Sequence, residues 1–95
     1  MKFEWDDNKN SINIKKHGLS FELAEGVFLD EFCLELYDEE HSSLEEDRYI
    51  VIGMLQDQIN IVTVVYTERD DVIRIISARK ATDIERKYYY ESSYS

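Results

Sequence analysis

The chain has 95 residues, of which 43% are hydrophobic, and a formal net charge of −10. This length suits one domain with a single core, and the apolar and aromatic content excludes a disordered chain. No apolar stretch approaches the length of a membrane span, and no basic-then-apolar leader opens the sequence. We therefore expect residues 1–95 to form one domain in the cytoplasm, with no membrane partner.

The charges are distributed unevenly. Residues 1–47 hold four Lys and no Arg against fourteen Asp and Glu, whereas residues 48–95 hold seven basic and seven acidic residues. Nucleic-acid binders are usually basic, because released counterions supply much of their affinity. The whole-chain charge thus argues against a nucleic-acid ligand, although a local basic surface can exist on an acidic protein. Cys33 is the single cysteine, and no Cys and His spacing predicts a metal site.

The first elements are a short strand and a helix. Phe3 and Trp5 alternate with polar neighbours, which predicts a strand. Asp6 or Asp7 can cap a helix that follows. Basic residues fill the last turn of this helix, and Gly18 is a natural left-handed stop.

A second helix is predicted after Ser20, which can act as its N-cap. Its apolar residues recur with helical spacing, so one side of this helix should pack against the rest of the protein. These residues are Phe21, Ala24, Val27 and Phe28. Two helices separated by so short a link predict an N-terminal helical hairpin.

The rest of the chain is predicted to form a sheet and a last helix. Short turns between consecutive strands favour an antiparallel meander. The strands are expected at residues 32–37, 48–55, 59–67 and 72–79, with a solvated acidic loop at 38–47. A capping box, Thr82 to Glu85, opens a third helix, and the tyrosine-rich tail from Tyr88 is expected to fray. The fold class is therefore α+β.

The last predicted strand is unusual because it carries cations in an apolar segment. Arg74, Arg79 and Lys80 lie in or next to it, and Arg69 precedes its turn. The planar guanidinium group matches phosphate oxygens with two parallel hydrogen bonds, so this sheet could present phosphate-binding groups. The separation of Arg74 and Arg79 is odd, so they share a face only if the strand ends or bulges before Arg79.

Four sequence motifs, in order over nearly the whole chain, resemble those of the BrnT family of bacterial toxins. These toxins are ribonucleases of type II toxin–antitoxin modules with a RelE-like fold. The motifs are Phe3-Glu4-Trp5-Asp6; Lys16-His17-Gly18 with Ser20-Phe21-Glu22-Leu23-Ala24 and Val27-Phe28; His41-Ser42 with Arg48 and Ile52-Gly53; and Glu68-Arg69 with Val72-Ile73-Arg74-Ile75-Ile76-Ser77-Ala78-Arg79-Lys80-Ala81-Thr82 and Glu85-Arg86.

The resemblance implies a helical hairpin packed on a small antiparallel sheet with a C-terminal helix. It also implies cleavage of RNA without a metal or cofactor, by attack of the ribose 2′-hydroxyl on the adjacent phosphorus. The implied partner is a BrnA-type ribbon-helix-helix antitoxin, with a heterotetramer as the expected assembly.

The resemblance also implies roles for individual residues. His17 would carry the proton, because imidazole titrates near neutral pH. Arg69 and Arg79 would clamp the phosphate, and Glu68 would act as a base or orient an arginine. Lys16, Arg74 and Lys80 are the further RNA-binding candidates. These cations are expected to converge in one anion-receiving cleft.

Plainer interpretations stand beside these roles. His17 closes a helix, where its cationic form suits the helix dipole. Arg69 lies among acids and could form a surface salt bridge. His41 could serve only to order the acidic loop, Arg48 to neutralise the acids before it, and Tyr66 to fill the core. The alternative function is a non-catalytic acidic module that binds a protein, either a decayed toxin or an adaptor.

Overall fold

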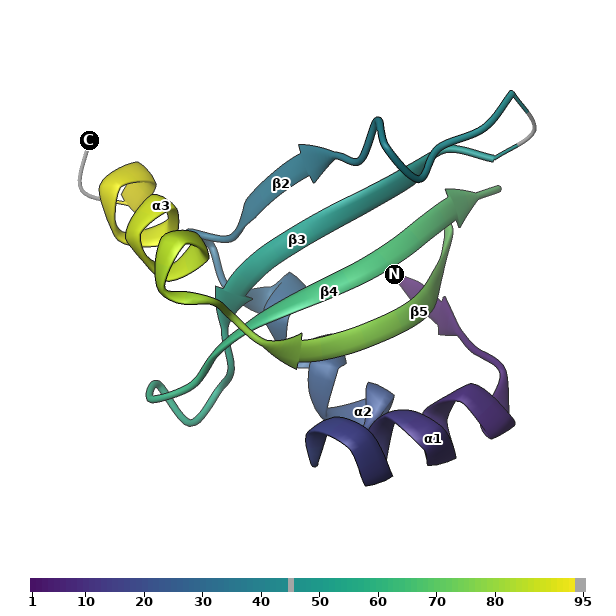
Figure 1. Ribbon diagram of the computed structural model, residues 1–95, viewed down its shortest axis with the longest axis horizontal. Coiled ribbons are helices and arrows are strands. Elements are labelled where there is room, and N and C mark those ends of the chain that lie inside the picture. The colour runs from purple at the N-terminus through teal and green to yellow at the C-terminus, as the bar shows by residue number, and fades with distance from the viewer. Residues whose placement is uncertain (45, 94–95) are drawn as a thin grey trace.

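The architecture is α+β, as predicted. The structure is a computed structural model that describes residues 1–44 and 46–93 (Figure 1). In chain order the elements are β1 (Lys2–Glu4), α1 (Asp7–His17), α2 (Phe21–Ala24), the 3-10 helix η1 (Glu25–Leu29), β2 (Leu34–Tyr37), β3 (Arg48–Met54), β4 (Ile61–Arg69), β5 (Val72–Lys80) and α3 (Asp83–Ser93). No helix within the described ranges has both the length and the apolar character needed to cross a bilayer.

The sheet is mixed and not purely antiparallel as expected. Strands β2, β3, β4 and β5 form the predicted antiparallel meander. Strand β1 then joins the far edge in parallel, beside Val72–Arg74 of β5, so the strand order is β1-β5-β4-β3-β2. The alternation of Phe3 and Trp5 predicts a strand but carries no information about its partner or direction, which explains the error.

The predicted N-terminal hairpin of two helices is wrong in its second half. Helix α1 begins after the N-cap Asp6 and ends at Gly18, whose φ of 69° is left-handed, as expected. Helix α2 has only four residues and continues as η1. The apolar stripe Phe21, Ala24 and Val27 is still fully buried. A spacing of three residues also keeps side chains on one side of a 3-10 helix, so the pattern could not distinguish the two helix types.

The two faces of the sheet are covered unequally. One face packs against α1, α2 and η1 and forms the larger core, which includes Phe21, Val27 and Val64. Gly53 lets η1 approach this face closely, because a Cβ atom there would lie 2.8 Å from Val27 Cγ1. The opposite face is covered by α3 at one end (Figure 1), where Tyr89 packs with Ile52 and its neighbours. We call the uncovered part of this second face the open face.

A bulge in β5 determines which side chains reach the open face. Val65 pairs with Ser77, but the next residue of β4, Tyr66, pairs with Ile75. One extra residue in β5 therefore reverses the alternation between the two halves of the strand. As a result Arg74 and Arg79 lie on the same face, which is the condition that the sequence alone left open.

The C-terminal helix is longer than expected. The capping box is present, since the Glu85 N–H donates to Thr82 Oγ1 and the Thr82 N–H donates to Glu85 Oε1. The expected fraying from Tyr88 is wrong, because α3 continues to Ser93. Tyr89 is buried, and its hydroxyl donates a 2.6 Å hydrogen bond to Asp30, which anchors the helix. Residues 94–95 of the expected tail lie outside the described residues.

The side chain of Asn13 ties α1 to the edge of β5. Its amide donates to the carbonyls of Ala78 at 2.8 Å and Leu19 at 2.9 Å, and its oxygen accepts the Ala78 N–H at 3.2 Å. The amide group thus pairs with Ala78 as a neighbouring strand would. All of these groups are buried, so the loss of this one side chain leaves several of them unpaired.

We expect Asn13→Ala to lower the free energy of unfolding by about 2–4 kcal/mol, because buried groups left without partners cost about 1–3 kcal/mol each. Urea denaturation measures the change. Asn8→Ala, an exposed position in the same helix, is the control and should change stability by less than about 1 kcal/mol. Equal effects of the two substitutions would contradict this role of Asn13.

Candidate functional site

The open face presents three rows of side chains across strands β3, β4 and β5. Arg48 and Arg74 both pair with Thr67, so their backbones lie roughly 10 Å apart on either side of it. The last row holds Thr63 and Arg79, roughly 13 Å away along β4. The middle row is Ile50, Val65 and Ser77. These rows thus hold three of the five arginines of this acidic chain, and the register places Arg69 on the same side of the sheet at the β4–β5 turn.

Arg79 is held at the α3 end of this face by Glu85. The two side chains form a bidentate ion pair with N–O distances of 2.7 and 3.0 Å, and Thr63 Oγ1 donates to the same carboxylate at 3.1 Å. Burial alone would raise the pKa of Glu85, but hydrogen bonds from Arg79, the Thr82 N–H and Thr63, with the charge of Arg79, lower this pKa to about 2. The hydrogen bond to Glu85 also raises the pKa of Arg79. The pair therefore fixes the guanidinium group over the face as a cation.

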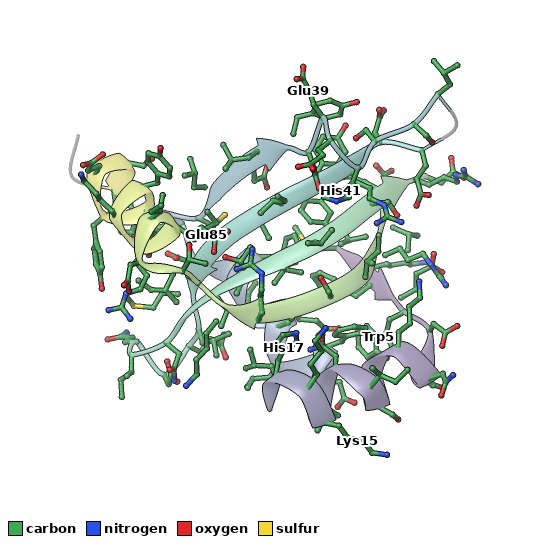
Figure 2. All side chains as sticks on the ribbon, in the orientation of Figure 1. Trp5, Lys15, His17, Glu39, His41 and Glu85 are labelled. Carbon is green, nitrogen blue, oxygen red and sulfur yellow. The ribbon has the colours of Figure 1, made fainter. Side chains whose placement is uncertain are left out.

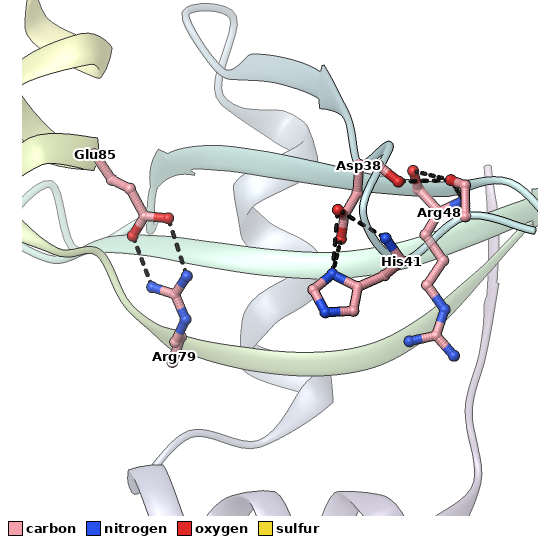
Figure 3. Close-up of polar contacts among 6 residues, drawn as sticks. Asp38, His41, Arg48, Arg79 and Glu85 are labelled. Carbon is pink, nitrogen blue, oxygen red and sulfur yellow. Dashed lines mark hydrogen bonds and ion pairs between the residues drawn. The ribbon is translucent and has the colours of Figure 1, made fainter.

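The acidic loop between β2 and β3 folds back over the sheet. Ser42 connects its two ends, since its hydroxyl donates to the Asp38 carbonyl at 2.7 Å and accepts the Arg48 N–H at 2.9 Å. The Asp38 N–H donates to the Arg48 carbonyl at 2.9 Å, which extends the β2–β3 pairing by one step. The loop is thus not only solvated, as expected, but closed at its base, and it brings His41 over the strands (Figures 2 and 3).

His41 and Asp38 form a pair at this loop. Nδ1 of His41 lies 2.9 Å from one oxygen of Asp38 and 3.2 Å from the other. The Asp38 side chain is 10% exposed, whereas that of His41 is 59% exposed. A carboxylate on Nδ1 favours the tautomer with the proton on that nitrogen and leaves Nε2 as an acceptor. Nε2 makes no hydrogen bond with the described residues, so this nitrogen is available to a ligand.

Figure 3 shows His41 over β4, between Arg79 at one end and Arg48 at the other. The guanidinium group of Arg48 makes no ion pair with any residue in the described ranges, although three acids precede it in the sequence. It reaches across the strands toward β5 (Figure 3). The arrangement is an imidazole with a free nitrogen, flanked by two guanidinium groups on the open face.

The other predicted residues lie outside these three rows. Lys16 and His17 are on α1, beside the β5 edge, and no hydrogen bond or ion pair joins the His17 side chain to another described residue (Figure 2). Lys80 is exposed at the end of β5. Arg79 pairs with Thr63, and Arg69 lies six residues further along β4. The backbones of Arg69 and Arg79 are therefore separated by roughly 20 Å.

A cavity of about 420 Å³ at the β4–β5 turn is lined by three of the predicted site residues, Glu68, Arg69 and Arg74. Arg69 and Arg74 share it with carboxylates, one of which, Glu4, lies 3.6 Å from Arg74. Its acidic lining residues are Glu4, Glu46, Asp47 and Glu68. The expected single cleft of His17, Arg69 and Arg79 is therefore not assembled, because the three lie on different parts of the fold.

Sequence reasoning gave His41 and Arg48 minor roles and did not select Asp38. The available signal was the motif His41-Ser42 with Arg48, which stands among the four quoted above. An Asp three residues before a His in a loop after a strand was a further indication. Within residues 1–44 and 46–93, no group of three or more His, Cys, Asp and Glu is placed to hold a metal ion.

Comparison with known families identifies a match over most of the chain. The model described as "Ribonuclease toxin, BrnT, of type II toxin-antitoxin system" matches residues 5–85. A search of curated proteins gave no significant match. The matched residues include β2 to β5, the loop with His41, and the start of α3 up to Glu85.

We expect the Arg79–Glu85 pair to make stability depend on pH. The pKa of Glu85 is lowered from 4.5 to about 2 by folding, so its stabilisation is present above about pH 4.5 and is lost as the pH falls toward 2. Between these values the wild type should lose at most about 3 kcal/mol more free energy of unfolding than Glu85→Gln. Urea denaturation across this pH range measures the difference. Parallel curves for the two proteins would contradict it, and Glu91→Gln is the exposed control.

Proposed function

The chain belongs to the BrnT family of ribonuclease toxins of type II toxin–antitoxin systems, and from this we propose that it is an endoribonuclease whose site is the open face. Family membership implies an RNA target and an antitoxin partner. In our proposal His41 is the proton carrier, Asp38 orients it, and Arg48, Arg74 and Arg79 bind phosphate groups.

One observation carries the proposal. An imidazole with a free Nε2, held by a carboxylate on Nδ1, lies over the same face as three arginines of a chain whose net charge is −10. An arginine of an acidic protein can bind RNA only if its donors are not all paired with neighbouring carboxylates. Arg48 has no such partner among the described residues. Arg79 uses one N–H of each terminal nitrogen on Glu85 and keeps other donors of its five.

The reaction that we propose is a phosphoryl transfer within the RNA, from the 5′ oxygen to the 2′ oxygen, with no metal. Nε2 of His41 takes the proton of a ribose 2′-hydroxyl, and the 2′ oxygen forms a bond to the adjacent phosphorus. The bond from phosphorus to the 5′ oxygen breaks, and that oxygen gains a proton, which the imidazolium can return. The products end in a 2′,3′-cyclic phosphate and a 5′-hydroxyl. Guanidinium groups stabilise the charge that develops on the phosphoryl oxygens.

Finer features complete the proposal. A meander with helices on one face and α3 at the end of the other supports the RelE-like fold that the sequence resemblance implies. We propose that the antitoxin is of the BrnA type, a ribbon-helix-helix protein, that the two form a heterotetramer, and that they act in the cytoplasm. His17, Arg69 and Glu68, with Lys16 and Lys80, stay predictions from the resemblance.

The two histidines provide the decisive comparison. We expect His41→Ala to reduce cleavage of RNA by about 10²–10⁴-fold, the usual contribution of a general base, and His17→Ala to reduce it by less than about tenfold. The measurement is cleavage of a labelled RNA at low salt by the purified protein, with identification of the 2′,3′-cyclic ends. The reverse order of effects would instead favour the site predicted from the sequence.

Arg48 supplies an independent test, since its side chain has no ion pair to lose with residues 1–44 or 46–93. We expect Arg48→Ala to reduce cleavage by about 10²–10³-fold and to leave stability within about 1 kcal/mol of the wild type. Arg86→Ala, an exposed arginine on α3, is the matched control and should retain activity. If the wild type itself cuts no RNA yet binds its antitoxin, the non-catalytic module is the better description.

A further inference from the structure

A second concave site lies on the other face of the sheet, beside the β4–β5 turn. This tyrosine cleft has a volume of about 440 Å³ and is lined by Glu35, Tyr49, Tyr66, Glu68, Asp70 and Asp71. It carries four carboxylates and no cation. None of these carboxylates forms a hydrogen bond or ion pair within the described part of the chain. The site is thus unlike the open face in both charge and composition.

Tyr66 provides a separate indication that the cleft receives a ligand. Its side chain is buried, with 4% relative exposure, yet it lines the cleft, and its hydroxyl has no hydrogen-bond partner among the described residues. Burial and the charges of Glu35 and Glu68 raise the pKa of Tyr66, so the hydroxyl stays protonated and lies near those carboxylates. No buried side-chain nitrogen or oxygen of the described residues lacks a partner, so this unpaired hydroxyl must open into the cleft, where a ligand can reach it.

Two tyrosine rings lie side by side in the wall of the cleft. Tyr49 and Tyr66 stack with their centroids 5.7 Å apart and an angle of 28° between planes. Tyrosine faces attract ammonium and guanidinium groups, and the surrounding carboxylates strengthen that attraction. Among the described residues, the carboxylates of the cleft are not placed to hold a metal ion together. An organic cation therefore fits this site better than a metal ion does.

We propose that the tyrosine cleft binds an arginine or lysine side chain carried by the antitoxin. The inference rests on the proposed function, because that function supplies the partner. RNA is repelled by four carboxylates, and a second copy of a chain with net charge −10 is also repelled. In the complex the cation contacts the partly exposed ring of Tyr49, and its N–H groups donate to the carboxylates and to the Tyr66 oxygen.

The first test uses acetyl-arginine amide as the probe and the uncharged isostere acetyl-citrulline amide as the control. Titration followed by ¹H–¹⁵N NMR should shift the amides of Tyr49, Tyr66 and Asp70–Asp71 with arginine and not with citrulline. We expect Glu35→Gln combined with Asp71→Asn to weaken binding about 3–10-fold. Asn suits the left-handed φ of 65° at position 71, so this variant should fold. Shifts spread over all acidic surfaces would overturn the proposal.

Two comparisons separate specific binding from general charge attraction. Glu22→Gln combined with Glu31→Gln removes the same charge from exposed positions and should change affinity less than twofold. Tyr66→Phe should weaken binding several-fold without lowering stability, because the hydroxyl has no partner to lose. If the control pair weakens binding as much as the cleft pair, the cleft is not a site.

The second test uses the purified antitoxin partner of this toxin. The Glu35→Gln, Asp71→Asn variant should bind it at least tenfold more weakly by calorimetry at low salt, while its cleavage of RNA stays unchanged. Unchanged antitoxin affinity would overturn the proposal, as would tight binding of spermidine that the antitoxin does not displace. Loss of RNA cleavage by wild type would instead count against the proposed function, so the two failures are distinguishable.

Discussion

The extra residue of β5 is the constraint on which the open face depends. Without the bulge between the pairs Val65–Ser77 and Tyr66–Ile75, Arg74 would point into the core of a small domain. A buried guanidinium group without a partner is too costly to tolerate there. With the bulge, the apolar residues Ile75 and Ala78 both reach the core, and both arginines reach the opposite face. The bulge therefore keeps the core apolar and also places both arginines on the open face.

The distribution of charge between the two faces explains how so acidic a chain can serve RNA. Three carboxylates beside the open face are already engaged: Asp38 orients His41, Glu85 holds Arg79, and Glu4 lies 3.6 Å from Arg74. The carboxylates of the tyrosine cleft lie on the other face of the sheet and have no such partner in the described part of the chain. Electrostatic fields fall off with distance in salt solution, so the two surfaces can keep opposite preferences on one small protein.

Local sequence signals predicted much of the fold. The caps at Asp6, Gly18 and Thr82, and the four-strand meander, follow from residue types and periods that act within a few positions. The partner of β1 and the bulge could not be derived, because both depend on pairing between distant segments. The same limit applied to the site. Arg74 and Arg79 were selected from the sequence, whereas His41 and Asp38 gain their importance only when Ser42 closes the loop over the sheet.

Asn13 has an effect beyond the stability of the helix that carries it. By occupying the backbone groups of Ala78, it closes the edge of β5 beyond the short β1 strand to any incoming polypeptide. Strand β1 has only three residues and offers few free groups of its own. Of the strands described, β2 is then the border at which the sheet can grow, so a protein that extends this sheet by strand addition must approach alongside Leu34–Tyr37.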